Sequence, residues 1–335
     1  MCKIPVVQAR KLFAKCRAST EPDERVCFEI KKACETWGVF QLVDTGFEQK
    51  LLHRAVKAVQ EFFDLPLATK RQVKRRQDNP SGWADDELTK QKKDLKEIFD
   101  FCYVPHRDLP DDDPRNRTID GTNQFPNDEP EIRRTLLEYF DEMQRCAFKL
   151  LECFCLSLDI DYEAMRKLFL DGIGFCRLNF YEPPFPQPEE EMQDSTLMLG
   201  IQPHTDAGFL TILWSSSVPG LEVYRNNEWV QMEPVTDSFT INVGDVCAVF
   251  TNGTFKAPLH RVLAPRLERR YSIPFFFNPS PSTTVKPLEA CVSQDSPAKY
   301  REFTWREFRE KRFEGDYTDQ GEEVQISHYL IENES

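Results

Sequence analysis

In the first half of the chain, apolar residues recur every three or four positions, which is the spacing of helices with one buried face. The pattern predicts helices over residues 24–37, 52–62 and 130–156. Gly38 ends the first of these helices, and a short strand over residues 39–43 follows it. The first half is therefore expected to be mainly helical.

After Phe169 the pattern changes to short apolar runs rich in aromatic and β-branched residues, separated by turn residues. These runs predict strands over residues 175–181, 210–214, 221–224, 229–232, 239–243, 246–250 and 271–277. Short strands at this spacing are typical of a sandwich or barrel. A last helix over residues 304–312 is expected to pack against it. The fold class predicted is α+β, with a mainly β core buttressed by helices.

A chain of 335 residues is long enough for one large domain or two closely joined ones. We expect residues 1–125 to form an N-terminal helical and mixed region. Residues 126–335 then provide the long helix, the β core and the C-terminal helix, and the two regions make one integrated catalytic unit.

Composition excludes several classes of protein. Hydrophobic residues make up 40% and charged residues 30%, which is an ordinary globular balance. The formal net charge of -13 argues against a nucleic-acid partner. No apolar run approaches the ~20 residues that span a bilayer, and the N-terminus does not resemble a signal peptide. No obligate protein partner is evident, so a small-molecule partner is expected.

The eleven cysteines do not form a recognisable disulfide framework. Their number is odd, and no Cys-x-x-Cys occurs. Scattered cysteines of this kind suit a reducing compartment, where they pack as small apolar residues. The sequence therefore predicts a cytoplasmic protein.

Three residues have the types and spacing of a metal site. His204 and Asp206 lie two positions apart, so in an extended chain their side chains fall on one face. His260 follows Asp206 by 54 positions (260 − 206) and lies beyond a predicted strand and turn. Two histidines and one carboxylate on one face leave three metal positions open, as oxygen-activating Fe(II) sites require. Zinc takes the same ligand types, and a hydrogen-bonded surface pair is the other interpretation.

Arg270 and Ser272 strengthen the Fe(II) interpretation. They lie ten residues after His260, at positions i and i+2 of a predicted strand, so both side chains point to one face. A guanidinium buried in a barrel requires an anionic partner. A dicarboxylate fits, with one end on the metal and the other bound by Arg270 and the Ser272 hydroxyl.

Segments throughout the chain then carry a family resemblance. They are residues 33–41, 62–66, 94–100, 178–184 (Leu-Asn-Phe-Tyr-Glu-Pro-Pro), 204–206 (His-Thr-Asp), 252–253 (Asn-Gly), 260–262 (His-Arg-Val) and 270–272 (Arg-Tyr-Ser). In this order they resemble the 2-oxoglutarate- and Fe(II)-dependent dioxygenase superfamily, in its isopenicillin N synthase-like branch. The resemblance covers nearly the whole chain and implies a double-stranded β-helix, or jelly roll.

The resemblance also implies roles for individual residues. The iron ligands, which are also the catalytic residues, would be His204, Asp206 and His260. The contacts to 2-oxoglutarate would be Arg270, Ser272 and Tyr181, with Asn179 and Arg177 as neighbours. Phe276, Ile98 and Asp100 would be the substrate contacts.

The implied reaction uses Fe(II), 2-oxoglutarate and O2. It releases succinate and CO2 and hydroxylates, desaturates or cyclises a small-molecule metabolite, as in secondary metabolite biosynthesis. An Fe(II) oxidase of the same fold that does not use 2-oxoglutarate remains an alternative. A non-catalytic metal-binding protein and a hydroxylase of protein or nucleic acid are further alternatives.

Overall fold

The computed structural model describes residues 3–15, 22–76, 78–89, 92–102, 122–172, 174–183, 198–315 and 324–331. Its helices are α1 (Glu24–Thr36), α2 (Gln49–Asp64), α3 (Leu67–Gln72), α4 (Pro130–Leu158), α5 (Tyr162–Lys167), α6 (Asp245–Phe250) and α7 (Trp305–Gly315), with short 3-10 turns at Glu289–Cys291 and Ile326–Tyr329. The predicted helices over residues 24–37, 52–62, 130–156 and 304–312 correspond to α1, α2, α4 and α7. Local signals explain their limits: the Asp23 carboxylate accepts the Arg25 N–H at the start of α1, and Pro130 begins α4.

Two sheets of unequal size form the β core of the described residues. The larger has the order β1 (Val6–Gln8), β2 (Val39–Val43), β12 (Phe239–Val243), β9 (Leu210–Ser215), β14 (Arg270–Phe277), β7 (Phe175–Tyr181), β6 (Glu97–Cys102) and β3 (Gly82–Ala84). The smaller has the order β11 (Glu228–Gln231), β10 (Leu221–Arg225), β13 (His260–Leu263) and β8 (Leu199–His204). Two further pairs are β4 (Leu88–Thr89) with β5 (Lys92–Lys93), and β15 (Thr284–Val285) with β16 (Phe303–Thr304). The N-terminal region thus supplies strands to both edges of the larger sheet.

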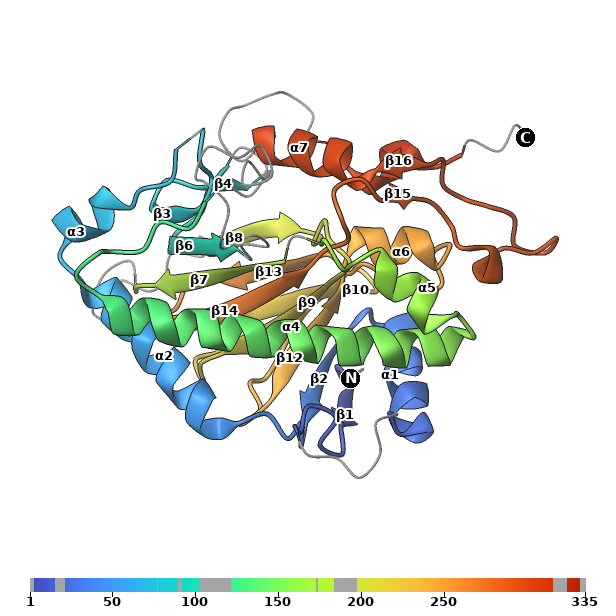
Figure 1. Ribbon diagram of the computed structural model, residues 1–335, viewed down its shortest axis with the longest axis horizontal. Coiled ribbons are helices and arrows are strands. Elements are labelled where there is room, and N and C mark those ends of the chain that lie inside the picture. Colours follow the sequence, from blue (N-terminus) through green and yellow to red (C-terminus); the bar gives the residue numbers. More distant parts are fainter. Residues whose placement is uncertain are drawn as a thin grey trace.

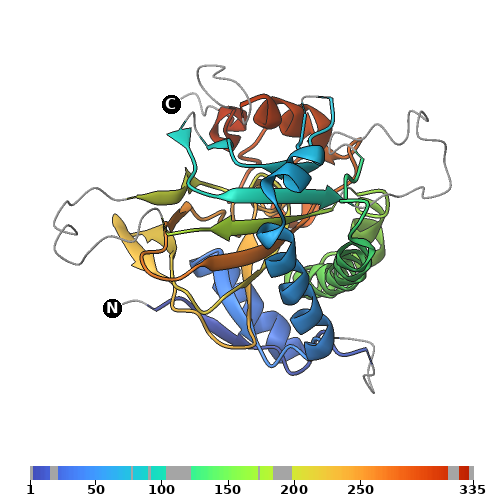
Figure 2. The ribbon, with the colours of Figure 1, turned by 90° about the vertical axis from the view of Figure 1, so that its left-hand side faces the viewer.

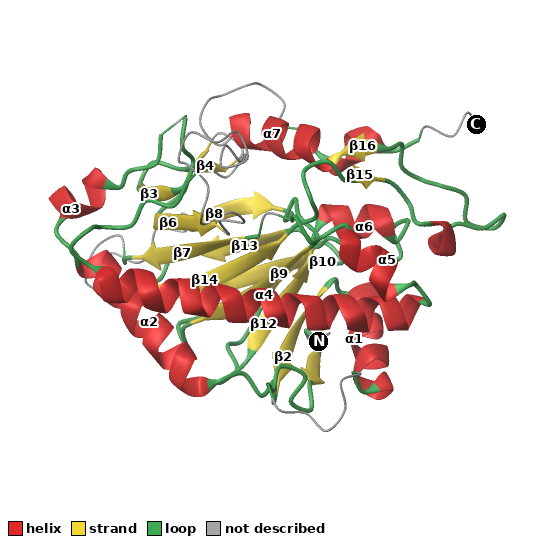
Figure 3. Cartoon of the chain, in the orientation of Figure 1, coloured by secondary structure: helices red, strands yellow, loops and turns green. Residues whose placement is uncertain are grey.

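Helix α4 crosses one face of the larger sheet, with α2 beside it (Figure 1). Aromatic side chains join the two layers: the ring centroids of Phe140 on α4 and Phe275 on β14 are 5.2 Å apart, and those of Phe148 and Phe277 are 5.1 Å apart. Viewed from the side, the sheets lie between α7 above and α1 below (Figure 2). The secondary-structure colouring shows the same layering of helices around a β core (Figure 3). The expected mainly β core buttressed by helices is confirmed.

The strand predicted over residues 246–250 is wrong, because this segment is helix α6. All six of its residues are buried, and an apolar run buried on every side shows no period that separates a strand from a helix. Gly244, which precedes the segment, is the N-cap of the helix and has an extended backbone. Strands β6 and β8 were not predicted, although β8 ends at a residue of the predicted metal site.

Within the described residues, no helix is long and apolar enough to cross a membrane. None of the nine cysteines in this part of the chain forms a disulfide, and all but Cys291 are buried. Cys2 and Cys16 lie outside the described residues.

Candidate functional site

Strand pairing brings the two predicted histidine ligands together. His204 is the last residue of β8, His260 is the first of β13, and the two are direct cross-strand partners with ring centroids 4.3 Å apart. Each Nδ1 lies near a backbone carbonyl, that of Gln202 at 2.8 Å and that of Pro258 at 3.1 Å. A proton on Nδ1 satisfies these contacts and leaves the lone pair of each Nε2 for a metal.

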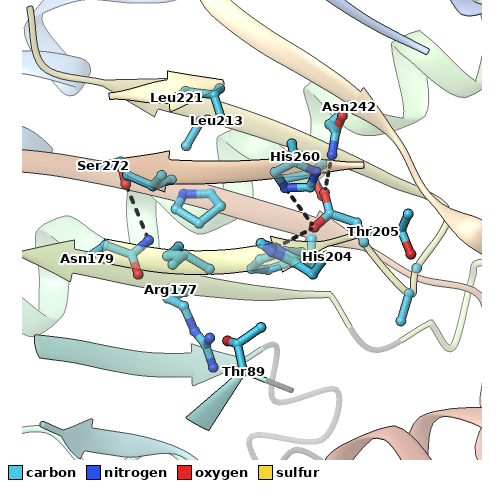
Figure 4. A pocket seen from close by; sticks show the side chains of 18 of the residues that line it. Thr89, Arg177, Asn179, His204, Thr205, Leu213, Leu221, Asn242, His260 and Ser272 are labelled. Carbon is cyan, nitrogen blue, oxygen red and sulfur yellow. Dashed lines mark hydrogen bonds and ion pairs between the residues drawn. The ribbon is translucent and has the colours of Figure 1, made fainter. Parts of the chain in front are cut away.

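Asp206 completes the cluster from the loop after β8. Its Oδ1 lies 3.8 Å from the Nε2 of His204 and 3.7 Å from the Nε2 of His260. One ligand atom from each of the three residues falls within 4.8 Å of the others (Figure 4). The other carboxylate oxygen, Oδ2, accepts hydrogen bonds from the Thr211 hydroxyl and the Asn242 amide, both at 2.6 Å.

Burial and mutual charge keep these groups in the forms that bind metals. Burial, reinforced by the neighbouring His260, lowers the pKa of His204 to about 3. Burial alone would raise the pKa of Asp206, but the facing histidines and its two hydrogen-bond donors outweigh it and lower the pKa. At neutral pH the cluster therefore offers a neutral His204 and a carboxylate, a donor set that Fe(II) accepts with positions left open.

Arg270 is a buried cation that lines the same cavity, whose volume is about 180 Å³. It is 2% exposed, and its guanidinium lies 4.9 Å from the centroid of the Tyr181 ring on the adjacent strand β7. Within the described residues its Nε and Nη1 have no hydrogen-bond partner. Burial lowers the pKa of Arg270, and its interaction with Tyr181 offsets this effect only in part.

Ser272 and Asn179 lie beside Arg270 on the cavity wall. Ser272 follows Arg270 by two residues on β14 and pairs with Asn179 on β7, whose amide donates to the Ser272 hydroxyl at 3.3 Å. Both side chains are 2% exposed. The three residues and Tyr181 therefore form one polar end of the cavity, and the histidines and Asp206 line the same cavity.

This arrangement fits a metal and a dicarboxylate together. A buried guanidinium without a partner costs several kcal/mol, and an anion at that point offsets the cost. A molecule with one carboxylate at Arg270 and a second oxygen-rich end at the histidine–aspartate cluster satisfies both groups at once.

Arg177 was expected beside the co-substrate, but its guanidinium is bound by carboxylates of the protein. Its Nε and Nη2 donate to both oxygens of Asp100 at 2.8 and 2.7 Å, and its Nη1 donates to Glu87 at 2.9 Å. Glu87 also pairs with Lys96 at 2.7 Å and with Arg75 at 3.0 Å. The Lys96 ammonium lies a further 3.0 Å from Asp94. We call these six residues the charged wall.

Of the three residues expected to contact substrate, Phe276 lines the cavity and stacks on Phe175, with ring centroids 4.4 Å apart. Ile98 is fully buried away from the cavity lining, and Asp100 is occupied by Arg177. The geometry therefore supports direct contact only for Phe276, and the assignments of Ile98 and Asp100 remain predictions.

Several residues that line the cavity were not predicted from the sequence. Glu87 and Lys96 belong to a run of charges that resembles a solvated surface, yet both are buried. Asn242 is a polar residue inside an apolar strand. A polar side chain at such a position requires a hydrogen-bond partner, so the sequence alone could have indicated Asn242. On α7, Arg312 donates to the backbone carbonyl of Thr205 at 3.2 Å, so the C-terminal helix reaches the metal cluster.

Two family profiles match the chain. The profile of the 2OG-Fe(II) oxygenase superfamily matches residues 173–279. A second profile, described as non-haem dioxygenase in morphine synthesis N-terminal, matches residues 4–128. The two profiles together span the N-terminal region and the strands of the β core that hold the site.

Similar proteins with curated names are plant oxygenases. The chain is 30% identical to oxoglutarate-dependent flavonoid 7-O-demethylase 1 of Ocimum basilicum, over 83% of this chain and 71% of the relative. It is 31% identical to jasmonate-induced oxygenase 4 of Arabidopsis thaliana, over 84% of this chain and 76% of the relative.

Solved structures with the same fold include JOX2 in complex with 2OG, Fe and JA. That structure has a TM-score of 0.75 and 26% identity, covering 92% of this chain and 84% of its own. The rice dioxygenase for auxin oxidation has a TM-score of 0.73 and 26% identity, covering 98% of this chain and 100% of its own. The expected double-stranded β-helix is thereby confirmed.

Proposed function

Because the chain belongs to the 2OG-Fe(II) oxygenase superfamily, we propose that its Fe(II) is held by His204, Asp206 and His260 and its 2-oxoglutarate by Arg270, Ser272 and Tyr181. The protein is an Fe(II)- and 2-oxoglutarate-dependent oxygenase that oxidises a small molecule. The observation that supports the residue assignment is the meeting of three metal-ligand atoms and one uncompensated buried guanidinium in a single cavity.

Iron and 2-oxoglutarate, when bound, supply the oxidising power. O2 is consumed, 2-oxoglutarate becomes succinate and CO2, and the substrate either gains one oxygen atom or loses two hydrogen atoms, which leave as water. The chain's own residues position the metal ligands and the co-substrate. Backbone carbonyls orient His204 and His260 through their Nδ1 atoms, and the lowered pKa of His204 keeps its Nε2 free of a proton at neutral pH. Arg270 fixes the orientation of 2-oxoglutarate through a fork that matches a carboxylate.

The other cavity residues have supporting roles in this proposal. Asn179 donates to Ser272 and so fixes the hydroxyl that the distal carboxylate would meet. Arg177 acts indirectly, because Asp100 and Glu87 occupy its guanidinium, and it shapes the charged wall. Phe276, stacked on Phe175, offers the substrate an apolar surface.

The proposed substrate is a small metabolite of the kind made in secondary metabolism. The similar curated proteins support this class, since their names specify a flavonoid and jasmonate induction. A net charge of -13 supports the proposal that nucleic acid is not a partner. The absence of a disulfide among the nine described cysteines supports a cytoplasmic location. We retain the division at residues 125 and 126 within one catalytic unit.

The test is turnover of 2-oxoglutarate labelled at C1, with purified protein, Fe(II), ascorbate, O2 and a panel of flavonoids, hormones and other plant-type metabolites. We expect labelled CO2 and succinate to form in equal amounts, and to rise with the right metabolite. Asp206→Ala is the matched control and should form neither. Oxidised product without succinate would contradict the use of 2-oxoglutarate and support the oxidase alternative.

A further inference from the structure

The two carboxylate oxygens of Asp206 have different surroundings. Oδ1 faces the Nε2 atoms of His204 and His260, at 3.8 and 3.7 Å. Oδ2 points the other way and accepts two short hydrogen bonds of 2.6 Å, from Thr211 Oγ1 and Asn242 Nδ2. Hydrogen bonds to an ionised oxygen are among the stronger ones in proteins, so Oδ2 is firmly held away from the cluster.

The sheet register brings the two donors to the same oxygen. Thr211 on β9 and Asn242 on β12 are direct cross-strand partners in the larger sheet. Their side chains are buried, and both line the cavity. Because neighbouring strands fix their backbones, the hydroxyl and the amide approach Asp206 from a rigid surface rather than from a loop.

The orientation of the Asn242 amide is fixed by its surroundings. If the amide were turned over, its Oδ1 would lie 2.6 Å from a carboxylate oxygen, and two acceptors at that distance repel. The amide nitrogen therefore faces Asp206. The Asn242 Oδ1 has no hydrogen-bond partner in the described part of the chain, so the contact with Asp206 alone sets the orientation of the amide.

The backbone of Asp206 is held separately. The N–H of Asp245, at the start of α6, donates to the Asp206 carbonyl at 2.8 Å. The Thr205 hydroxyl donates to the Asp245 carboxylate at 3.2 Å. With the main chain fixed in this way, rotation of the carboxylate is the freedom that Thr211 and Asn242 remove.

We propose that Thr211 and Asn242 are positioning residues that make Asp206 a ligand through one oxygen, Oδ1. Turning the carboxylate to present both oxygens would break both of its short hydrogen bonds. An aspartate that binds through one oxygen would leave more of the metal's positions for 2-oxoglutarate and O2 than one that binds through both oxygens. This inference rests on the proposed function of the histidine–aspartate cluster.

The test measures the affinity of the purified protein for Mn(II), a probe that is stable in air, by calorimetry without co-substrate. Loss of a hydrogen-bond partner of a metal ligand typically weakens metal affinity by roughly 10- to 100-fold. Thr211→Val and Asn242→Ala should each weaken Mn(II) binding by about that factor. Thr211→Ser keeps the hydroxyl and should bind Mn(II) within about threefold of wild type. The electron paramagnetic resonance spectrum of bound Mn(II) should change in the first two variants and not in Thr211→Ser.

Thr283→Val is the control for a general loss of stability. Thr283 is also buried, and its hydroxyl donates to the Leu168 carbonyl at 3.3 Å, away from the cavity lining. We expect it to bind Mn(II) as wild type does. Should Asn242→Ala fail to fold, the Thr211→Val and Thr211→Ser pair tests the proposal alone.

Wild type and Asp206→Ala are titrated with Mn(II) first. This step tests the metal site separately from the positioning role of Thr211 and Asn242. Equal Mn(II) affinity in these two proteins would overturn the metal site itself. If Asp206→Ala loses Mn(II) but Thr211→Val and Asn242→Ala match wild type in affinity and spectrum, the metal site stands and the positioning role is overturned.

Discussion

Arg177 and Arg270 line the same cavity from adjacent strands, yet their surroundings are opposite. Arg177 makes three hydrogen bonds to two carboxylates, Asp100 and Glu87. Arg270 is more deeply buried and lies over the Tyr181 ring, without a carboxylate partner in the described residues. A buried charge that the protein has already balanced is structural, whereas one left unbalanced indicates where a charged ligand binds.

The charged wall around Arg177 is balanced as a whole. It contains three cations and three anions: Arg75, Lys96 and Arg177 with Glu87, Asp94 and Asp100. Burial alone would raise the pKa of Glu87, but the three cations outweigh it and hold the pKa well below its usual range. Burial would likewise lower the pKa of Lys96, but Asp94 and Glu87 raise it. The wall therefore needs no ligand to be stable.

The largest expected effect is at the metal cluster, which lines the same cavity as both arginines. Asp206→Ala removes the only anionic member of the cluster and should lower turnover by ~1000-fold or more, because a catalytic metal supplies several kcal/mol of stabilisation. His204→Ala and His260→Ala should act in the same direction without unfolding the protein. Succinate formation and bound iron are the measurements. Full activity in any one variant would remove that residue from the iron site.

Replacement by methionine should affect the free energy of unfolding of the metal-free protein differently at the two arginines. Arg177→Met leaves Asp100 and Glu87 short of a partner and should lower the free energy of unfolding by ~3–5 kcal/mol, toward the lower figure because the side chain of Arg177 is 17% exposed. Arg270→Met removes an unpaired buried charge and should leave the free energy of unfolding unchanged or raise it. Urea unfolding measures both. Equal losses in the two variants would refute the contrast.

Arg270→Lys keeps the charge but loses the planar fork, so it should raise the KM for 2-oxoglutarate. Charged hydrogen bonds contribute ~1.5–3 kcal/mol, which corresponds to roughly 10- to 150-fold. Ser272→Ala loses one hydrogen bond from a neutral donor, at the lower end of this range, and should raise the KM by only about 10-fold. Iron content should stay at the wild-type level in both variants. An unchanged KM in Arg270→Lys and in Arg270→Ala would contradict the co-substrate assignment.

The pH dependence of stability tests the metal cluster separately from the two arginines. The pKa of His204 is lowered to about 3 in the folded protein, against about 6.5 in an unfolded chain. Between these values the unfolded chain binds a proton that the folded protein does not. The metal-free protein should therefore lose stability as the pH falls below about 6.5, by up to ~1.4 kcal/mol per pH unit. His204→Gln should reduce this slope, and an unchanged slope would contradict the shift.

The sequence predicted that His204, Asp206 and His260 would lie together, but it did not predict the charged wall. His204, Asp206 and His260 belong to few chemical types, and their order along the chain carries information about the site. The partners of Arg177 could not be predicted, because their pairing depends on the register of β6 with β7, where Asp100 faces Arg177. Residues 246–250 were wrongly assigned to a strand because complete burial hides the helical period.

The most direct measurement compares two 2-oxo acids of equal length, 2-oxoglutarate and 2-oxovalerate, which lacks the distal carboxylate. Each is titrated without O2 into the Fe(II)-loaded wild type, Arg270→Met and Arg177→Met. In wild type and Arg177→Met we expect 2-oxoglutarate to bind at least about 10-fold more tightly, as a charged hydrogen bond provides. In Arg270→Met the two acids should bind alike, while iron remains bound. A preference for 2-oxoglutarate that survives in Arg270→Met would contradict the proposed site.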